Sequence, residues 1–222
     1  MNELKKVYNE TEWNKDLKGM SLNKQKLNEM VMEYLVIEGF QDVAHKFALE
    51  TGIDPKADME AIQRRMEIRT SIESGNIQEA IYSINELDAE ILDTNPDVYF
   101  KLQLQILIEL VRNGTADGVK EALQFARTEL APRCFDNPEY LSGVEEVMGL
   151  LVTPQDGRQP ELLHFSQRQN LASYINSVIL SSQGKENKSK LPHMVKSLVW
   201  SELRLSEKAI YPTLFSDTSM QS

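Results

Sequence analysis

The stretch LNEMVMEYLVIEGFQDVAHKFALETG, residues 27–52, decides how this chain folds. Its apolar residues recur at the spacing of three and four that places them along one side of an α-helix, and two others form a second, narrower stripe. The first stripe holds Leu27, Met30, Val31, Tyr34 and Leu35, and the second holds Met32 and Val36. A helix that is apolar on two sides is normally buried on two sides, so this one needs a further partner beyond the helix that follows it.

Glycines and capping residues predict where the helices begin and end. Gly39 and Gly52 each follow an apolar-periodic run, where a left-handed residue ends a helix. Asp58 is a suitable N-cap for a helix that runs to about Ser74, and Gly75 is the residue expected after its end.

Three joints between helices carry their own capping signals. Asn76, with Glu79 three residues later, predicts a capping box for the helix after Gly75. The segments DTNPDVYF and DNPEYL each place an asparagine before a proline, as an N-cap followed by the first helical residue. Such short joints favour antiparallel neighbours.

The sequence therefore predicts an all-α fold of stacked antiparallel helical hairpins. No stretch combines strand alternation with hairpin turn residues. The last long helix is expected to start near Leu191. We expect one apolar helix pair followed by a larger helical bundle.

Composition excludes several classes of function. The 222 residues have a formal net charge of -10, which argues against nonspecific binding to nucleic acid or to an anionic membrane. A single cysteine rules out an internal disulfide and points to a reducing compartment. The N-terminal residues lack the apolar core of a signal peptide, and no apolar run approaches a membrane span. We expect a protein of the cytoplasm and nucleus.

The sequence offers little for catalysis. His45, His164 and His193 lie far apart, and one cysteine with three histidines cannot make a RING-type zinc module. Cys134 beside Arg133 is a possible nucleophile, but a lone thiol in a segment between helices is the favoured interpretation. We expect no catalytic, cofactor or metal site.

Arg65 and Arg69 stand out because helical spacing places them in the middle of an apolar arc. Ile62, Met66, Ile68 and Ile72 form that arc. A buried guanidinium needs a carboxylate or several carbonyl acceptors. The favoured interpretation is structural, with each arginine bridging two helices; the functional one is an interface arginine that awaits an acidic partner. The sequence leaves both open.

Three segments together resemble a known family. Residues 27–52 resemble a LisH motif. The stretch IQRRMEIRTSIESGNIQEAIYSINELDAEILDTNPDVYFKLQLQILIEL, residues 62–110, resembles a CTLH motif, and LLHFSQRQ with KSLVWSELRLSEKAIYP resembles a CRA region. The residues that match the LisH pattern are Leu27, Val31, Tyr34, Leu35, Gly39, Phe40, Ala44, Phe47, Glu50, Thr51 and Gly52. The marks of CTLH are Ile68, Arg69, Ile72, Gly75, Ile77, Ala80, Ile81 and Ile84.

This order of motifs is similar to that of the small LisH–CTLH–CRA scaffold subunits of the GID/CTLH E3 ubiquitin ligase complex. The resemblance implies an N-terminal segment (1–24), a LisH motif (25–57), a CTLH motif (58–115), a CRA region (116–212) and a flexible tail (213–222). Two departures affect the CRA region: LLVTPQ has a threonine where the family usually has an aromatic residue, and NGTADGVKE is long.

The resemblance implies a non-catalytic scaffold that promotes ubiquitin-dependent degradation. Expected partners are RanBPM-like and RING-bearing LisH–CTLH–CRA proteins and substrate-receptor subunits, with homo- or heterodimerisation through LisH. The expected interface residues are Leu27, Val31, Met32, Tyr34, Leu35, Val36, Phe40 and Phe47, with Arg65, Arg69 and Gly75 as structural or interface residues. Within one chain, Leu27, Val31 and Leu35 can instead pack on Phe40, Ala44 and Phe47. The alternative function is an adaptor in a cytoskeletal or transcriptional assembly.

Overall fold

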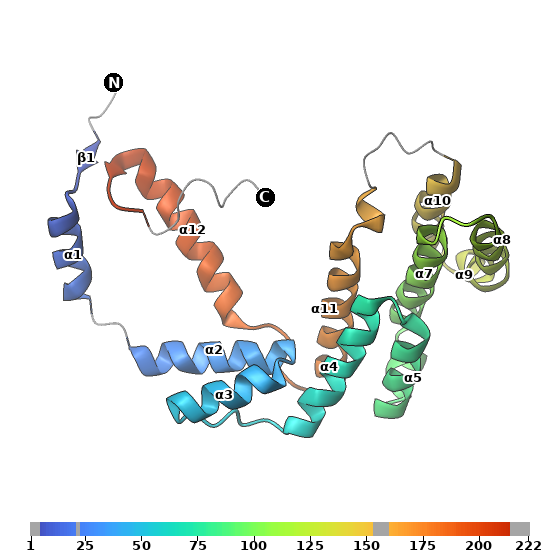
Figure 1. The fold of residues 1–222 in the computed structure, drawn as a ribbon, viewed down its shortest axis with the longest axis horizontal. Coiled ribbons are helices and arrows are strands. Elements are labelled where there is room, and N and C mark those ends of the chain that lie inside the picture. The colour runs from blue at the N-terminus through green and yellow to red at the C-terminus, as the bar shows by residue number, and fades with distance from the viewer. Residues whose placement is uncertain (1–4, 21–22, 153–159, 214–222) are drawn as a thin grey trace. The chain divides into compact units, whose positions relative to one another are not determined.

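The computed structural model describes residues 5–20, 23–152 and 160–213 (Figure 1). Helices dominate these residues, which confirms the all-α prediction, and none of the described helices is long and apolar enough to span a bilayer. The helices are α1 (Glu10–Gly19), α2 (Lys24–Glu38), α3 (Gln41–Thr51), α4 (Met59–Ser74), α5 (Ile77–Leu87), α6 (Glu90–Thr94), α7 (Pro96–Arg112), α8 (Ala116–Phe125), α9 (Ala131–Asp136), α10 (Glu139–Val152), α11 (Phe165–Ser182) and α12 (Lys190–Lys208).

A short parallel pairing of β1 (Lys6–Val7) with β2 (Ala209–Ile210) was not expected from the sequence. Two residues on each side are too few to show alternation, so no sequence pattern could announce them. The threonine of LLVTPQ, at position 153, lies outside the described residues, as do residues 214–222 of the expected tail.

The chain divides into two compact units. The first contains residues 1–34, 46–55 and 189–222, and the second contains residues 35–45 and 56–188. The predicted LisH, CTLH and CRA boundaries concern motifs rather than compact units, and they stay predictions.

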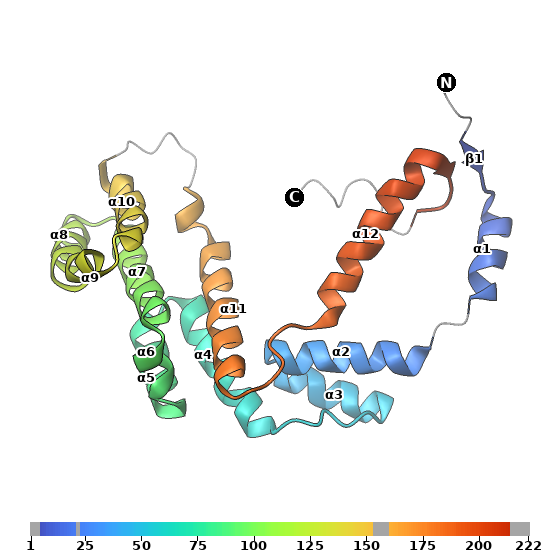
Figure 2. The same cartoon turned by 180° about the vertical axis from the view of Figure 1, so that it is seen from behind.

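The second unit is built around α7, which contributes to two apolar cores. Val98 and Leu102 join the core formed with α4, α5, α6 and α11, where α4 and α11 lie side by side (Figures 1 and 2). Leu107 and Ile108 join the core formed with α8, α10 and the 3-10 turn Glu161–Leu163. A helix with apolar residues on both sides is buried on both sides, as its sequence LQLQILIEL indicates.

The predicted helix ends are partly confirmed. Asp58 caps α4 by accepting a hydrogen bond from the Glu60 N–H at 3.0 Å, and Gly75 ends α4 with φ +89°. The capping box at Asn76 is wrong, because its side chain makes no capping bond. Asn76 also closes α4, donating its N–H to Ser71 O, and this holds its ψ at 63° rather than in the extended region that an N-cap requires.

A π-helical turn, Ala126–Leu130, joins α8 to α9 in one continuous rod. Pro132 lies at the start of α9 and has no N–H to donate, so the regular ladder cannot continue through it. The Ala131 N–H instead reaches back to Ala126 O, five residues earlier.

Candidate protein-interaction surfaces

A buried arginine of α4 fastens the end of α2 within the second unit. Arg65 is 4% exposed and donates from Nη1 to Ile37 O at 2.9 Å and from Nη2 to Val36 O at 2.8 Å. It also donates from Nη1 to Asn176 Oδ1 at 2.7 Å, while Asn176 Nδ2 donates to Ile37 O at 2.8 Å. The last turn of a helix has carbonyls without partners, and a cation there also opposes the helix dipole. Arg65 therefore caps α2 from α4.

The charge on Arg65 is held by carbonyl dipoles rather than by a direct carboxylate. Burial lowers the pKa of this guanidinium, the nearby Arg69 charge lowers it further, and Glu38 raises it. An arginine still carries its proton at neutral pH. Its bonds to Val36 and Ile37 are thus charge-assisted ones within the chain.

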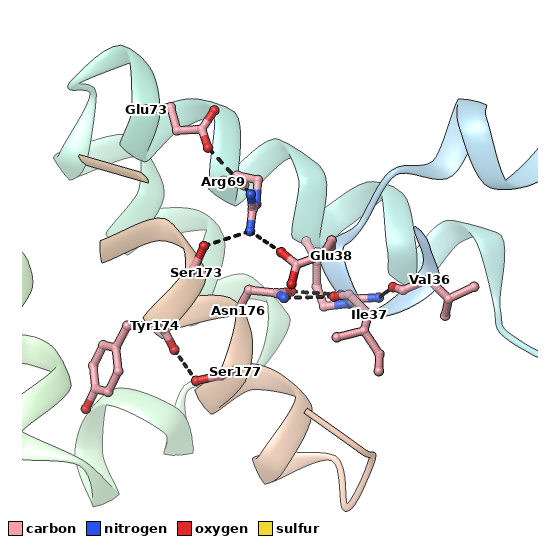
Figure 3. A network of polar contacts seen from close by, with 10 residues as sticks. Val36, Ile37, Glu38, Arg69, Glu73, Ser173, Tyr174, Asn176 and Ser177 are labelled. Atoms are coloured by element: carbon pink, nitrogen blue, oxygen red, sulfur yellow. Dashed lines mark hydrogen bonds and ion pairs between the residues drawn. The ribbon is translucent and has the colours of Figure 1, made fainter. Parts of the chain in front are cut away.

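Arg69 has an acidic partner in the same chain. Its Nη2 donates to Glu38 Oε2 at 2.8 Å and to Ser173 Oγ at 3.1 Å, and its Nη1 lies 3.7 Å from Glu73 Oε1 (Figure 3). The guanidinium carbon lies 5.9 Å from the Phe40 ring centroid. The structure thus brings Arg65 and Arg69 together on one side of α4, each tied to the end of α2.

Gly75 lies beside a second ion-pair cluster, formed by Glu109, Arg112 and Arg168. Besides its positive φ, a Cβ at this position would lie 2.6 Å from Arg168 Nη2. Arg168 donates to both carboxylate oxygens of Glu109 and to Glu73 O, and Arg112 Nε donates to Glu109 Oε2 at 3.0 Å. Burial by itself would raise the pKa of Glu109, but hydrogen bonds from Arg168 and Gln105 and the arginine charges hold it below its usual value.

The LLHFSQRQ segment now has a local explanation. Leu163 is buried, and its carbonyl accepts a hydrogen bond from Arg112 Nη1. His164 caps α11 by accepting from the Ser166 N–H, and Arg168 makes the Glu109 pair. The segment aligns α11 on α7.

The eight predicted LisH interface residues differ in exposure. Met32 (3% exposed) and Leu35 (8%) are already buried in the single chain, whereas Leu27 is 42% exposed. The half-buried members are Val31, Tyr34, Val36, Phe40 and Phe47. Exposure is also high at Val43 (51%) and Leu49 (75%) of α3, which the prediction left out because they lie outside the LisH pattern.

Helix α12 presents an apolar face that the predicted site residues did not include. Glu202 is its only buried residue. Its exposed apolar side chains include Met194 (46%), Val195 (45%), Leu198 (42%), Leu203 (53%) and Leu205 (37%). The signal was present in the sequence as an amphipathic pattern, but periodicity cannot distinguish a face buried in the chain from one left open.

Cys134 was expected in a segment between helices, but it lies inside α9. The helix continues through the π-turn, which explains the difference. Burial raises the pKa of the Cys134 thiol, so less of it is thiolate at neutral pH than in a free cysteine. Over the described residues, His, Cys, Asp and Glu side chains form no group of three or more that could hold a metal ion.

Two family models match the chain. The CTLH/CRA C-terminal to LisH motif domain matches residues 61–206, and LisH matches residues 25–51. The chain is 43% identical to "Protein GID8 homolog" of Arabidopsis thaliana, covering 94% of this chain and 85% of the relative. It is 43% identical to "Glucose-induced degradation protein 8 homolog" of Dictyostelium discoideum, with 96% and 93% covered. It is 36% identical to "GID complex subunit 8" of Schizosaccharomyces pombe, with 90% and 87% covered.

Proposed function

The chain belongs to the LisH and CTLH/CRA family that includes the GID8 homologues, and from this membership we propose that it is a non-catalytic scaffold subunit of a GID/CTLH-type E3 ubiquitin ligase. The name "GID complex subunit 8", carried by a relative whose length is covered to 87%, supports the assembly. In this role the chain joins RING-bearing and substrate-receptor subunits, and ligation chemistry belongs to a partner.

The observation that carries the proposal is the open apolar face of α12. A scaffold must offer apolar surface for another chain to bury. The apolar face of α12 exposes Met194, Val195, Leu198, Leu203 and Leu205, and Glu202 is the one buried residue of this helix. Large exposed apolar patches generally mark interaction sites. Leu27 of α2, in the same compact unit, adds to this supply.

The free energy gained by burying the α12 face can be compared with the cost of association. Each half-exposed α12 side chain contributes about 1 kcal/mol when a partner covers it, so five in each of two chains contribute roughly 10 kcal/mol. Association itself costs about 4–15 kcal/mol. The α12 face alone gives a marginal dimer, and the LisH residues of α2 and α3 are needed to make it firm.

We infer partners from the same family resemblance. RanBPM-like and RING-bearing LisH–CTLH–CRA proteins would bind through homologous helices, as homo- or heterodimers, and substrate receptors would attach to the assembled scaffold. We place the complex in the cytoplasm and nucleus. An adaptor in a cytoskeletal or transcriptional assembly is the outcome that would replace this proposal.

Affinity purification of the tagged chain from its native source tests the assembly. We expect RING-bearing LisH–CTLH–CRA proteins at stoichiometric amounts. Recovery of cytoskeletal or transcriptional proteins without any RING-bearing relative would reject the ligase role.

Light scattering on matched variants tests the surface. We expect Leu198→Asp to lower the oligomer mass, because it places a charge in the apolar face of α12. Ser197→Asp is the control, since it puts the same charge on an exposed residue of the polar side of the same helix. Equal masses for Leu198→Asp and the wild type, with the fold intact by circular dichroism, would exclude α12 as a docking face.

A further inference from the structure

The first described residues of the chain are bonded to the end of its last helix. β1 and β2 pair in parallel, with Lys6 opposite Ala209 and Val7 opposite Ile210, and the Tyr8 N–H donates to Ile210 O at 2.8 Å. Both strands belong to the first compact unit. A pairing of two residues is too short to hold by itself, so other contacts must support it.

An aromatic cluster supplies one of these contacts. The Trp13 ring centroid lies 4.8 Å from that of Tyr211, with the planes inclined at 34°, and the Tyr8 ring meets Trp13 edge-on at 5.9 Å. Tyr211 is 9% exposed, and its hydroxyl donates to Glu202 O in α12 at 2.9 Å. Aromatic pairs in these arrangements are attractive beyond the area that they bury.

A charged contact completes the attachment. Lys5 Nζ donates to Ser206 O at 2.7 Å. Ser206 lies in the last turn of α12, where carbonyls lack partners within the helix and where the helix dipole favours a cation. Lys5 thus acts as a C-terminal cap supplied by a residue 201 positions away.

We propose that residues 5–13 are an N-terminal clasp that holds the last turns of α12 in place. The clasp lies outside both family-model matches, which begin at residues 25 and 61. Leu203 and Leu205 lie in the turns that it holds. The role of the clasp rests on the proposed function. It keeps that end of the α12 docking face in a single conformation before a partner binds, which reduces the entropy cost of binding.

Hydrogen exchange on the isolated chain tests the clasp. We expect Trp13→Ala to speed exchange of residues 199–208 by about two- to tenfold, the ratio that an aromatic pair supports. Residues 62–72 of α4 serve as the internal reference and should exchange as in the wild type. Trp200→Ala is the control, because Trp200 sits on α12 itself, is 61% exposed and takes no part in the clasp. Exchange of residues 199–208 at the wild-type rate in Trp13→Ala would overturn the proposal.

A cross-link tests the register. In a Cys134→Ser background, Lys6→Cys with Ala209→Cys should form a disulfide on oxidation, because register partners on neighbouring strands lie within reach of one. Lys6→Cys with Lys196→Cys should not, since Lys196 lies about three helical turns before the end of α12. Absence of the first cross-link, or equal yield from both pairs, would overturn the clasp. Neither readout needs a partner, so failure of the proposed function leaves both results interpretable.

Discussion

Replacing Arg65 by methionine should detach the end of α2 from α4 and destabilise the second unit. Methionine keeps much of the length and apolar stem but removes the donors to Ile37 O, Val36 O and Asn176 Oδ1. Ile37 O keeps the bond from Asn176 Nδ2, so two acceptors rather than three lose their only such donor.

The magnitude follows from those two acceptors. Leaving a buried acceptor without a partner costs about 1–3 kcal/mol, and removing the desolvation cost of a guanidinium offsets part of the loss. We expect a net loss of about 2–4 kcal/mol in the free energy of unfolding. Arg65→Lys should fall between methionine and the wild type, because one ammonium cannot reproduce the two-nitrogen geometry.

Urea unfolding followed by circular dichroism at fixed protein concentration measures this loss. Arg64→Met is the matched control, because Arg64 is the neighbouring residue on α4 and its pair with Glu60 is exposed to solvent. We expect no measurable change for Arg64→Met. A loss below about 1 kcal/mol for Arg65→Met, with unchanged hydrogen exchange at residues 35–38, would refute the capping role of Arg65.

Three further predictions concern Gly75, Glu109 and Cys134. Gly75→Ala should lower Tm, because alanine is strained at φ +89° and its Cβ would displace Arg168; Gly149→Ala, with open space around it, should not. The lowered pKa of Glu109 means that its contribution to stability is present above the unfolded carboxyl pKa and is lost as pH falls through the folded value, so Glu109→Gln should flatten the acid side of a Tm–pH curve, and an unchanged slope would contradict this. The raised pKa of Cys134 should make its reaction with iodoacetamide at neutral pH slower than that of free N-acetylcysteine, and a faster reaction would revive the nucleophile interpretation.

Local signals in the sequence predicted much of the fold. Asp58 and Gly75 mark the two ends of α4 as expected, because an N-cap oxygen and a left-handed glycine act within a few residues of the helix end. The capping box predicted at Asn76 was wrong for a reason that is also local. Asn76 lies at the junction of two helices, and closing α4 keeps its backbone out of the extended conformation that an N-cap of α5 requires.

Contacts across long separations lay beyond such reasoning. The arc position of Arg65 indicated a buried arginine, but nothing in the sequence identified Asn176, 111 residues away, as one of its acceptors. The same holds for Lys5 and Ser206. Periodicity shows which face of a helix is apolar, and only the folded chain shows that α12 keeps that face open while Met32 and Leu35 are enclosed.

The position of α7 between two apolar cores has a consequence for how the second unit loses its structure. Val98 and Leu102 of α7 belong to one core, and Leu107 and Ile108 of the same helix belong to the other. If either core unfolds, α7 loses the packing on one of its sides, and the other core depends on that helix. The helices from α4 to α11 should therefore come apart in one cooperative step, and damage at either end of α7 should be felt at both.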